Sequence, residues 1–382
     1  MHQDFRLFNG LEKGVANGDI TATDFGEYRL YKYSFECHMA QRWGEFTSEA
    51  RGIICHVPTK SIVARPLKKF HNLSELESTK LENLPLDKPF YLQEKLDGSC
   101  IVTYLHGHSL ATATPGSFIS DQAKYANAWL HQHLILTQEE YLKGQHVNDP
   151  GYWPLNKFKA DNKYLTFIFE AIYPENLNVV SYGSRNELVL LSVREHSGQE
   201  LHPNRVDELA AFYKFSRPRV FDYSLDADLI NKIPKDEEGY VAFWPELELR
   251  VKVKGETYVA LHRIKSMFSQ RGVCECLADG RYGDLYRILP QHLAKECDDI
   301  ASLLRTKFYA FKHIAEDIYE SVKNLPTRKE QALKIQNDPH REIYGVVFTM
   351  LDAQKKSIAP DIIDRMIWRV IYQGLEGKGK HV

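Results

Sequence analysis

The segment Glu94-Lys95-Leu96-Asp97-Gly98-Ser99 lies between two runs of apolar and aromatic residues, FYLQ at 90–93 and CIVTYL at 100–105. Both runs are typical of strands, so Lys95 is predicted in a turn between them. A lysine there can act as a nucleophile, but at a pKa of about 10.4 only about one amine in two thousand is neutral at pH 7. Burial or neighbouring cations must therefore activate it. Alone the motif is weak, because Lys-x-Asp-Gly arises by chance in roughly one chain in ten of this length. A hairpin with a solvated lysine is the simpler alternative.

The pattern around this turn is rich in strands from about residue 28 to residue 258, with one predicted helix at 122–136. So many short strands indicate mixed or antiparallel sheets. After residue 258 the apolar residues recur at helical three- and four-residue steps, as at 304–322 and 362–371, so this part is predicted to be all-helical. The predicted fold class is therefore α+β, with domains at 1–265 and 266–382. The strand runs are YRLYKYSF (28–35), ARGIICHV (50–57), YLTFIFEAI (164–172), ELVLLSV (187–193), GYVAFW (239–244) and LRVKVK (249–254).

The composition is that of an ordinary globular protein of 382 residues, with 49 basic and 51 acidic residues. A formal net charge of −2 excludes a global attraction to polyanions, so nucleic-acid binding would need a local basic cleft. The six cysteines lack paired CxxC spacing, which argues against a disulfide scaffold and a zinc ribbon, and buried thiols are expected. We find no signal peptide and no apolar run long enough for a membrane span, so we expect a cytoplasmic protein without membrane association.

Further motifs appear in a fixed order along the strand-rich part. Arg51-Gly52 and the segment ARPLKKFHN at 64–72 precede Lys95, and Phe169-Glu170, Glu238-Gly239-Tyr240-Val241 and Lys252-Val253-Lys254 follow it. This series resembles the covalent nucleotidyltransferase superfamily of ATP-dependent RNA ligases, DNA ligases and messenger-RNA capping enzymes. Over about residues 28–265 the chain looks most like the T-even type of phage RNA ligases, which repair cleaved tRNA.

The resemblance implies a role for each matching residue. It makes Lys95 the nucleophile that becomes adenylated, and it makes 1–265 an adenylyltransferase domain. Residues 266–382 are then expected to recognise the RNA substrate. The remaining positions that the resemblance marks are Tyr33, Arg51, Lys69, Glu170, Lys252 and Lys254 for binding ATP, Glu238 and Asp284 for a metal, and Asp97 and Tyr258 as otherwise essential for activity.

These residue types suit attack on the α-phosphate of ATP, which builds negative charge on the phosphoryl oxygens. Alternation along Val251-Lys252-Val253-Lys254 puts both lysines on one face, where they can hold phosphates and lower the pKa of Lys95. Glu238 offers hard oxygen ligation for Mg²⁺, or alternatively Mn²⁺. The alternative for this strand is a solvated lysine face above a valine core.

The chain departs from the family at Thr112-Ala113-Thr114-Pro115-Gly116-Ser117. The family usually has a lysine just before the Gly-Ser pair, whereas no basic residue occurs here. Either another cation substitutes for that lysine, or Ser117 and backbone N–H groups contact the phosphate.

The predicted function is ATP-dependent ligation of RNA with 5′-phosphate and 3′-hydroxyl ends, and cleaved tRNA is one expected substrate. We expect a monomer that acts in the cytoplasm, which is the host's cytoplasm if a phage encodes the protein. DNA ligases and capping enzymes usually continue into a small β-barrel after the last motif, whereas this chain turns helical. Two further alternatives stay open, namely transfer of AMP to proteins and a non-catalytic RNA-binding module.

Overall fold

The computed structural model describes residues 2–144, 154–176, 178–267, 270–287, 289, 291–353 and 360–376. The chain divides into two compact units, Met1–Val259 and Ala260–Val382. The predicted boundary at 265/266 lies six residues beyond this division, inside helix α8 (Glu256–Met267). The α+β fold class is confirmed, because antiparallel sheets with covering helices form the first unit and helices form the second.

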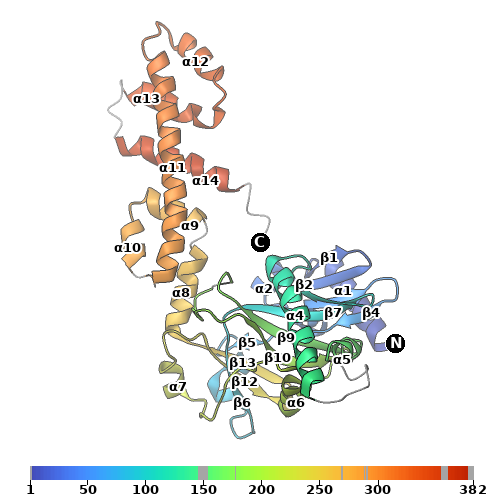
Figure 1. The fold of residues 1–382 in the computed structure, drawn as a ribbon. Coiled ribbons are helices and arrows are strands. Elements are labelled where there is room, and N and C mark those ends of the chain that lie inside the picture. Colours follow the sequence, from blue (N-terminus) through green and yellow to red (C-terminus); the bar gives the residue numbers. More distant parts are fainter. Residues whose placement is uncertain are drawn as a thin grey trace. The chain divides into compact units, whose positions relative to one another are not determined.

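The first sheet of the first unit is an antiparallel meander. Helix α1 (His2–Ala16) packs on β1 and β4 (Figure 1). Its Leu7, Phe8 and Leu11 share a buried core with the sheet. The short helices α2 (Phe35–Met39) and α3 (Glu45–Glu49) lie between β2 and β3 in the chain. The strands are β1 (Ile20–Phe25), β2 (Tyr28–Tyr33), β3 (Arg51–His56) and β4 (Ser61–Ala64).

The second sheet is also antiparallel, in the order β10-β9-β7-β8, and it shares a buried core with the helices that cover it. Helix α4 (Asp121–Gly144) packs on β8 and α6 (Pro203–Tyr213) on β10. The helix predicted at 122–136 is thus present and extends further at its C-terminal end. The remaining elements of this layer are β7 (Ser99–His106), β8 (Ser109–Ala113), β9 (Leu165–Ile172), β10 (Glu187–Glu195) and α5 (Pro154–Asp161).

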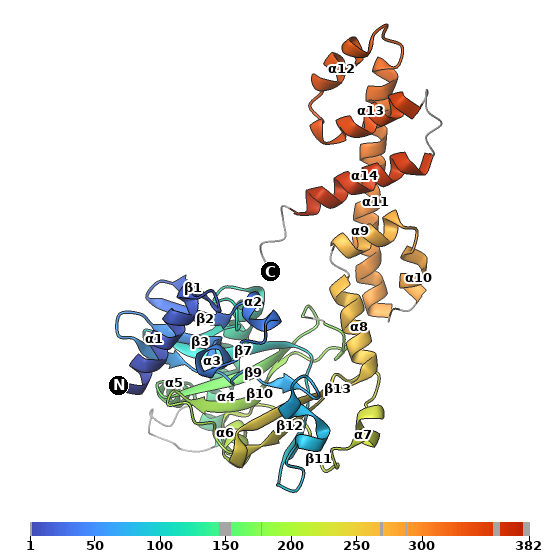
Figure 2. The ribbon, with the colours of Figure 1, turned by 180° about the vertical axis from the view of Figure 1, so that it is seen from behind.

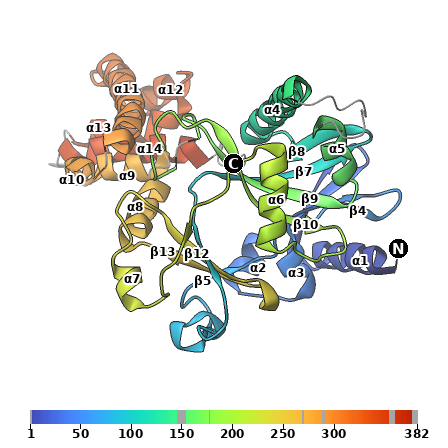
Figure 3. The ribbon, with the colours of Figure 1, turned by 60° about the horizontal axis from the view of Figure 1, so that its bottom comes forward.

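The third sheet has the order β11-β6-β12-β13-β5, and only its β13–β5 pair is parallel. Figure 3 labels the strands β5, β12 and β13 of this sheet. Its strands β6 and β12 bring the Lys95 turn next to Glu238, because β6 ends just before Lys95 and β12 begins just after Glu238. The elements are β5 (His71–Asn72), β6 (Tyr91–Glu94), β11 (Val220–Phe221), β12 (Gly239–Trp244), β13 (Leu249–Lys254), α7 (Ala227–Asn231) and the 3-10 turns Glu77–Thr79, Leu81–Asn83 and Pro245–Leu247.

A buried ion-pair cluster ties the first sheet to the second. The Glu49 carboxylate at the end of α3 accepts hydrogen bonds from Arg65 Nη2 at 2.9 Å and from Arg194 Nη1 at 2.8 Å. Arg65 follows β4, whereas Arg194 lies on β10. Removing one member of such a buried cluster leaves an uncompensated charge, so the cluster fixes how the two sheets meet.

Every regular element among the described residues of the second unit is a helix. Helices α9, α11 and α14 pack on one another (Figure 2). The core of the unit includes Cys274, Leu304, Phe308 and Ile367. The helices are α9 (Gln270–Ala278), α10 (Tyr282–Arg287), α11 (Gln291–Val322), α12 (Arg328–Gln336), α13 (Tyr344–Ala353) and α14 (Pro360–Glu376), with a 3-10 turn at Arg341–Ile343. All six cysteines of the chain are free and five are buried, as predicted. Within the described ranges, we find no helix with the length and apolarity that a bilayer crossing requires.

Candidate active site

Lys95 lies where the second and third sheets join. Strand β6 pairs with β11 and β12, whereas β7 pairs with β8 and β9, so the turn at 95–98 passes from one sheet to the other. The alternative of a simple hairpin is therefore wrong. The Lys95 backbone N–H donates to the Gly239 carbonyl at 2.9 Å, which extends the β6–β12 pairing up to the lysine.

A buried carboxylate holds the Lys95 amine. Lys95 Nζ donates to Glu238 Oε2 at 2.7 Å, and Lys254 Nζ lies 3.0 Å from Glu238 Oε1. Glu238 is only 3% exposed. Its position depends on Gly239, which has φ +133°, and a Cβ there would lie 2.0 Å from the Val253 carbonyl oxygen. Two lysines thus share one carboxylate, and together they leave a net positive charge.

Lys252 and Arg51 add two basic side chains to the same cleft, which has a volume of about 280 Å³. Val251 and Val253 are buried on the other face of β13, as the alternation predicts. Lys252 Nζ lies 4.6 Å and Arg51 Cζ 5.0 Å from the centre of the Phe70 ring. Burial and then the neighbouring cations, Arg51 first, lower the pKa of Lys252 to about 6. The alternative of a solvated lysine face is wrong, because Lys252 lines the cleft.

Glu170 is the second carboxylate of the cleft. Its Oε1 accepts a hydrogen bond from the Gly98 backbone N–H at 3.0 Å. Burial raises the pKa of Glu170 to about 7, an effect that Lys95 opposes and the Glu238 carboxylate reinforces. Gly98 is required here, because a Cβ on it would lie 2.4 Å from the Ala171 carbonyl oxygen.

Asp97 and Tyr258 form the support beneath the Lys95 turn. Asp97 Oδ2 accepts hydrogen bonds from the backbone N–H groups of Val179 and Val180, at 2.7 and 2.9 Å. Asp97 Oδ1 accepts one from the Tyr258 hydroxyl at 2.8 Å. Burial, together with the nearby carboxylates of Glu238 and Asp97, raises the pKa of Tyr258. Both side chains are buried, so their contacts position the turn.

Tyr33 and Lys69 both contact Trp43, a residue that was not predicted to belong to the site. The centre of the Trp43 ring lies 5.0 Å from the centre of the Tyr33 ring and 5.2 Å from Lys69 Nζ. Lys69 Nζ is also 3.6 Å from Glu75 Oε1. Burial lowers the pKa of Lys69, an effect that Glu75 opposes. The spacing of four residues between His71 and Glu75 was the signal in the sequence that could have indicated this acid. In the structure, His71 Nδ1 lies 2.9 Å from Glu75 Oε1.

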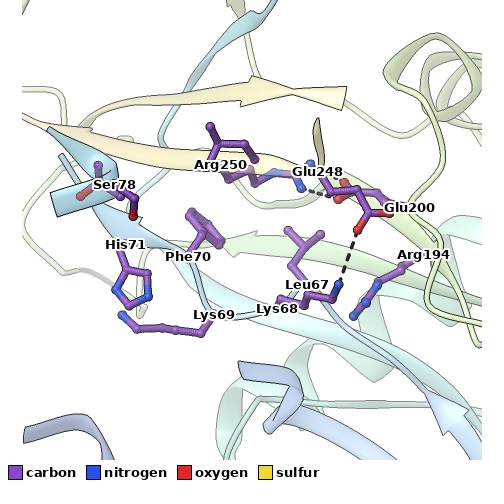
Figure 4. A pocket seen from close by; sticks show the side chains of 12 residues that line it. Leu67, Lys68, Lys69, Phe70, His71, Ser78, Arg194, Glu200, Glu248 and Arg250 are labelled. Carbon is purple, nitrogen blue, oxygen red and sulfur yellow. Dashed lines mark hydrogen bonds and ion pairs between the residues drawn. The ribbon is translucent and has the colours of Figure 1, made fainter. Parts of the chain in front are cut away.

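A second hollow shares Leu67 and Phe70 with the cleft (Figure 4). Its charged residues are already paired within the chain. Arg250 contacts Glu200, and Lys68 Nζ lies 3.5 Å from Glu248 Oε2. In the cleft, by contrast, four basic side chains (Arg51, Lys95, Lys252 and Lys254) lie together, and Lys95 and Lys254 share one carboxylate. The cleft is therefore better suited to a polyanion than the hollow.

The donor set fits a divalent metal held mainly by a substrate. In the described ranges, no three His, Cys, Asp or Glu side chains gather as a metal site. Mg²⁺ is commonly bound through one or two carboxylates together with substrate phosphates and waters, and Glu238 meets that requirement. Asp284 lies on α10 of the second unit, where its exposed carboxylate is 3.3 Å from Arg287 Nη1. Its predicted metal role stays a prediction.

A family model and a phage protein both relate this chain to RNA ligases. A family described as RNA ligase matches residues 49–241, which include Arg51, Lys69, Lys95, Glu170 and Glu238. An RNA ligase of Rhodothermus phage RM378 is 22% identical over 398 residues, covering 89% of this chain and 88% of its own.

Among solved structures, a putative ATP-dependent DNA ligase from Aquifex aeolicus is 13% identical, with 80% of each chain covered and a TM-score of 0.46. An archaeal ATP-dependent RNA ligase is 14% identical, with 79% of each chain covered and a TM-score of 0.45.

Proposed function

The chain belongs to the RNA ligase family and is an ATP-dependent RNA ligase, and from that premise we propose that it works through a covalent Lys95–AMP intermediate. Lys95 Nζ attacks the α-phosphorus of ATP, so that a P–N bond forms, the bond to the β-phosphate oxygen breaks, and pyrophosphate leaves. An oxygen of the RNA 5′-phosphate then attacks the same phosphorus and breaks the P–N bond. Finally, the 3′-hydroxyl attacks the RNA 5′-phosphorus, which seals the strand and releases AMP.

The observation that carries this proposal is the Glu238 carboxylate shared by Lys95 and Lys254 in a cleft lined with further cations. Phosphoryl transfer depends on positioning and on neutralising the charge of the phosphoryl oxygens. Arg51, Lys252 and Lys254 line the cleft beside Lys95 and supply that positive charge. Mg²⁺ or Mn²⁺, when bound, adds positive charge against the phosphate oxygens, and Glu238 is the carboxylate suited to hold it.

Glu238 also positions the nucleophile. Lys95 Nζ donates a hydrogen bond to Glu238 Oε2 at 2.7 Å, and an amine must be free of its extra proton before it can attack. Any cation that competes for the Glu238 carboxylate weakens this hydrogen bond, and Lys254 Nζ at 3.0 Å is one such competitor. Attack on ATP therefore requires that Lys95 Nζ be released from Glu238.

For the natural substrate, we propose cleaved tRNA bound in part by the helical second unit. Residues 260–382 carry more basic than acidic residues, whereas residues 1–259 carry more acidic than basic ones, so the positive charge suited to RNA is concentrated in the helical unit. We propose further that the protein acts in a host's cytoplasm, with which the phage origin of the relative is consistent, and that it acts as a monomer.

The test is incubation of the protein and its Lys95→Ala variant with ATP, Mg²⁺ and a 5′-phosphorylated single-stranded RNA or the matching DNA. We expect RNA circles from the wild type only, and an intact mass increased by one AMP that Lys95→Ala lacks. A nicked anticodon stem-loop added as competitor should be sealed faster than the linear RNA. AMP that passes from the enzyme to a protein extract instead of RNA would contradict the proposal.

A further inference from the structure

The turn at Thr114–Ser117 lacks the basic residue that the family usually has before Gly-Ser, and another strand reaches this place. We propose that Lys32, on strand β2, binds the phosphate oxygens that the absent lysine would bind. A Cβ built on Gly116 would lie 3.6 Å from Lys32 Nζ and 3.8 Å from its Cδ. The inference rests on the proposed function, since it assigns one more substrate contact to the same reaction.

The turn is fixed against the first sheet at Gly52. That residue has φ +95°, and a Cβ on it would lie 2.6 Å from the Pro115 Cα. The Thr114 N–H donates to the Ser117 carbonyl at 2.9 Å, which closes the turn. Pro115 therefore packs on the β3 backbone directly beside Arg51. Pro115, which stands where the family has the lysine, thus packs on β3, and the Lys32 amine of β2 lies next to Gly116.

The pairing of β2 with β3 places Lys32 next to Arg51. Lys32 is the cross-strand partner of Arg51, at the point where the pairing becomes irregular. Arg51 lines the cleft with Lys95 and Lys252. The irregularity in pairing between Tyr31 and Lys32 coincides with Gly52, which makes room for Pro115.

Lys32 is exposed, in contrast to Lys252 and Lys69 deeper in the site. An exposed amine beside Arg51 suits phosphates that project outward from the cleft. Two sources have this chemistry, namely the β- and γ-phosphates of ATP and the 5′-phosphate of RNA. The contact adds charge-assisted hydrogen bonding to an oxygen anion, and Lys32 forms no bond to the reacting phosphorus.

The test measures two steps separately in the full-length protein. Formation of Lys95–AMP from ATP reports on the triphosphate, and sealing of a pre-adenylated RNA without ATP reports on the RNA phosphate. We expect Lys32→Gln to slow at least one step by about ten- to a hundredfold, the effect of losing a charged hydrogen bond. Lys32→Arg should keep most of the rate. Lys13→Gln, on the exposed face of α1, is the matched control for loss of one positive charge.

A second-site variant tests position more stringently. Pro115→Lys should restore the affected step in the Lys32→Gln background, because it returns a basic residue to the place before Gly116. If that variant lowers the melting temperature, the comparison of Lys32→Arg with Lys32→Gln still decides. Unchanged rates for Lys32→Gln in both steps, or equal losses for Lys32→Arg and Lys32→Gln, overturn the inference. A wild-type protein that forms no Lys95–AMP would instead overturn the proposed function.

Discussion

Raising the pH from 6 to 8 should weaken phosphate binding, because it removes the charge of Lys252. Burial and the cations Arg51 and Lys69 hold the pKa of this lysine at about 6. At pH 8 only about one Lys252 in a hundred is then charged, against about half at pH 6. A bound phosphate favours the charged amine, so binding at pH 8 should take up about one proton.

The size of the effect follows from the charged fraction. If only the charged form binds well, apparent affinity scales with that fraction, which falls about fiftyfold between pH 6 and pH 8. This change corresponds to about 2.3 kcal/mol of binding free energy. Below pH 5 the amine is almost fully charged, so the dependence should level off there.

The assay is titration calorimetry with inorganic pyrophosphate, on AMP-free protein, in two buffers of different ionisation enthalpy at pH 6, 7 and 8. Lys252→Arg is the matched control, because arginine stays charged throughout and the titration of pyrophosphate itself cancels in the comparison. Glu170 has a pKa of about 7 and becomes anionic in the same range, which also weakens phosphate binding. Both proteins should therefore carry Glu170→Gln. Equal pH dependence and equal proton uptake with lysine and arginine at position 252 would refute the reasoning.

Three further predictions concern buried carboxylates. Glu238→Gln should slow formation of Lys95–AMP by about a hundredfold or more in a labelled-ATP assay, because the charge that orients Lys95 and suits a metal is lost; an unchanged rate and metal dependence would contradict this. Asp97→Asn should lower the free energy of unfolding in urea by about 2 kcal/mol, because the amide N–H₂ would face N–H or O–H groups that now donate hydrogen bonds to the carboxylate. An unaltered midpoint of the urea unfolding curve would count against the support role. Glu49→Gln should cost about 3–5 kcal/mol at pH 7. Its arginine partners overcome the opposing effect of burial and lower the pKa of Glu49 to about 2, so its stabilisation is present above the unfolded-state pKa of about 4.3 and is lost as the pH falls toward 2. A difference in melting temperature between the wild type and Glu49→Gln that stays constant down to pH 2 would argue against this.

Features that depend on neighbouring residues could be predicted from the sequence. The alternation at 251–254 was enough to separate the two lysines from Val251 and Val253, because side chains alternate along any strand. The helical steps after residue 258 likewise predicted the helical second unit. The motif order gave Lys95 and Glu238 as parts of one site, and the structure places them 2.7 Å apart.

Contacts between distant segments had no such signal. Arg65 stood inside a recognisable motif, yet only the fold shows that it shares Glu49 with Arg194 of β10. Glu75 could be paired with His71 by spacing alone, whereas its contact with Lys69 depends on the path of the segment between them. The degree of burial could not be predicted either. The sequence does not indicate that Lys252 is deeply buried, although burial is the main cause of the lowered pKa of Lys252.

The missing lysine before Gly116 shows why a motif is an incomplete description of a phosphate site. A phosphate oxygen needs a cation at a point in space, and any strand that reaches the point can supply it. At Thr114–Ser117 three local features act together. Gly52 lets Pro115 pack on β3, the packed turn leaves no basic side chain of its own, and the pairing of β2 with β3 brings Lys32 within reach of Gly116. The cation can therefore come from either position, so Pro115→Lys should change the rate little while Lys32 is present and should raise it strongly once Lys32 is replaced.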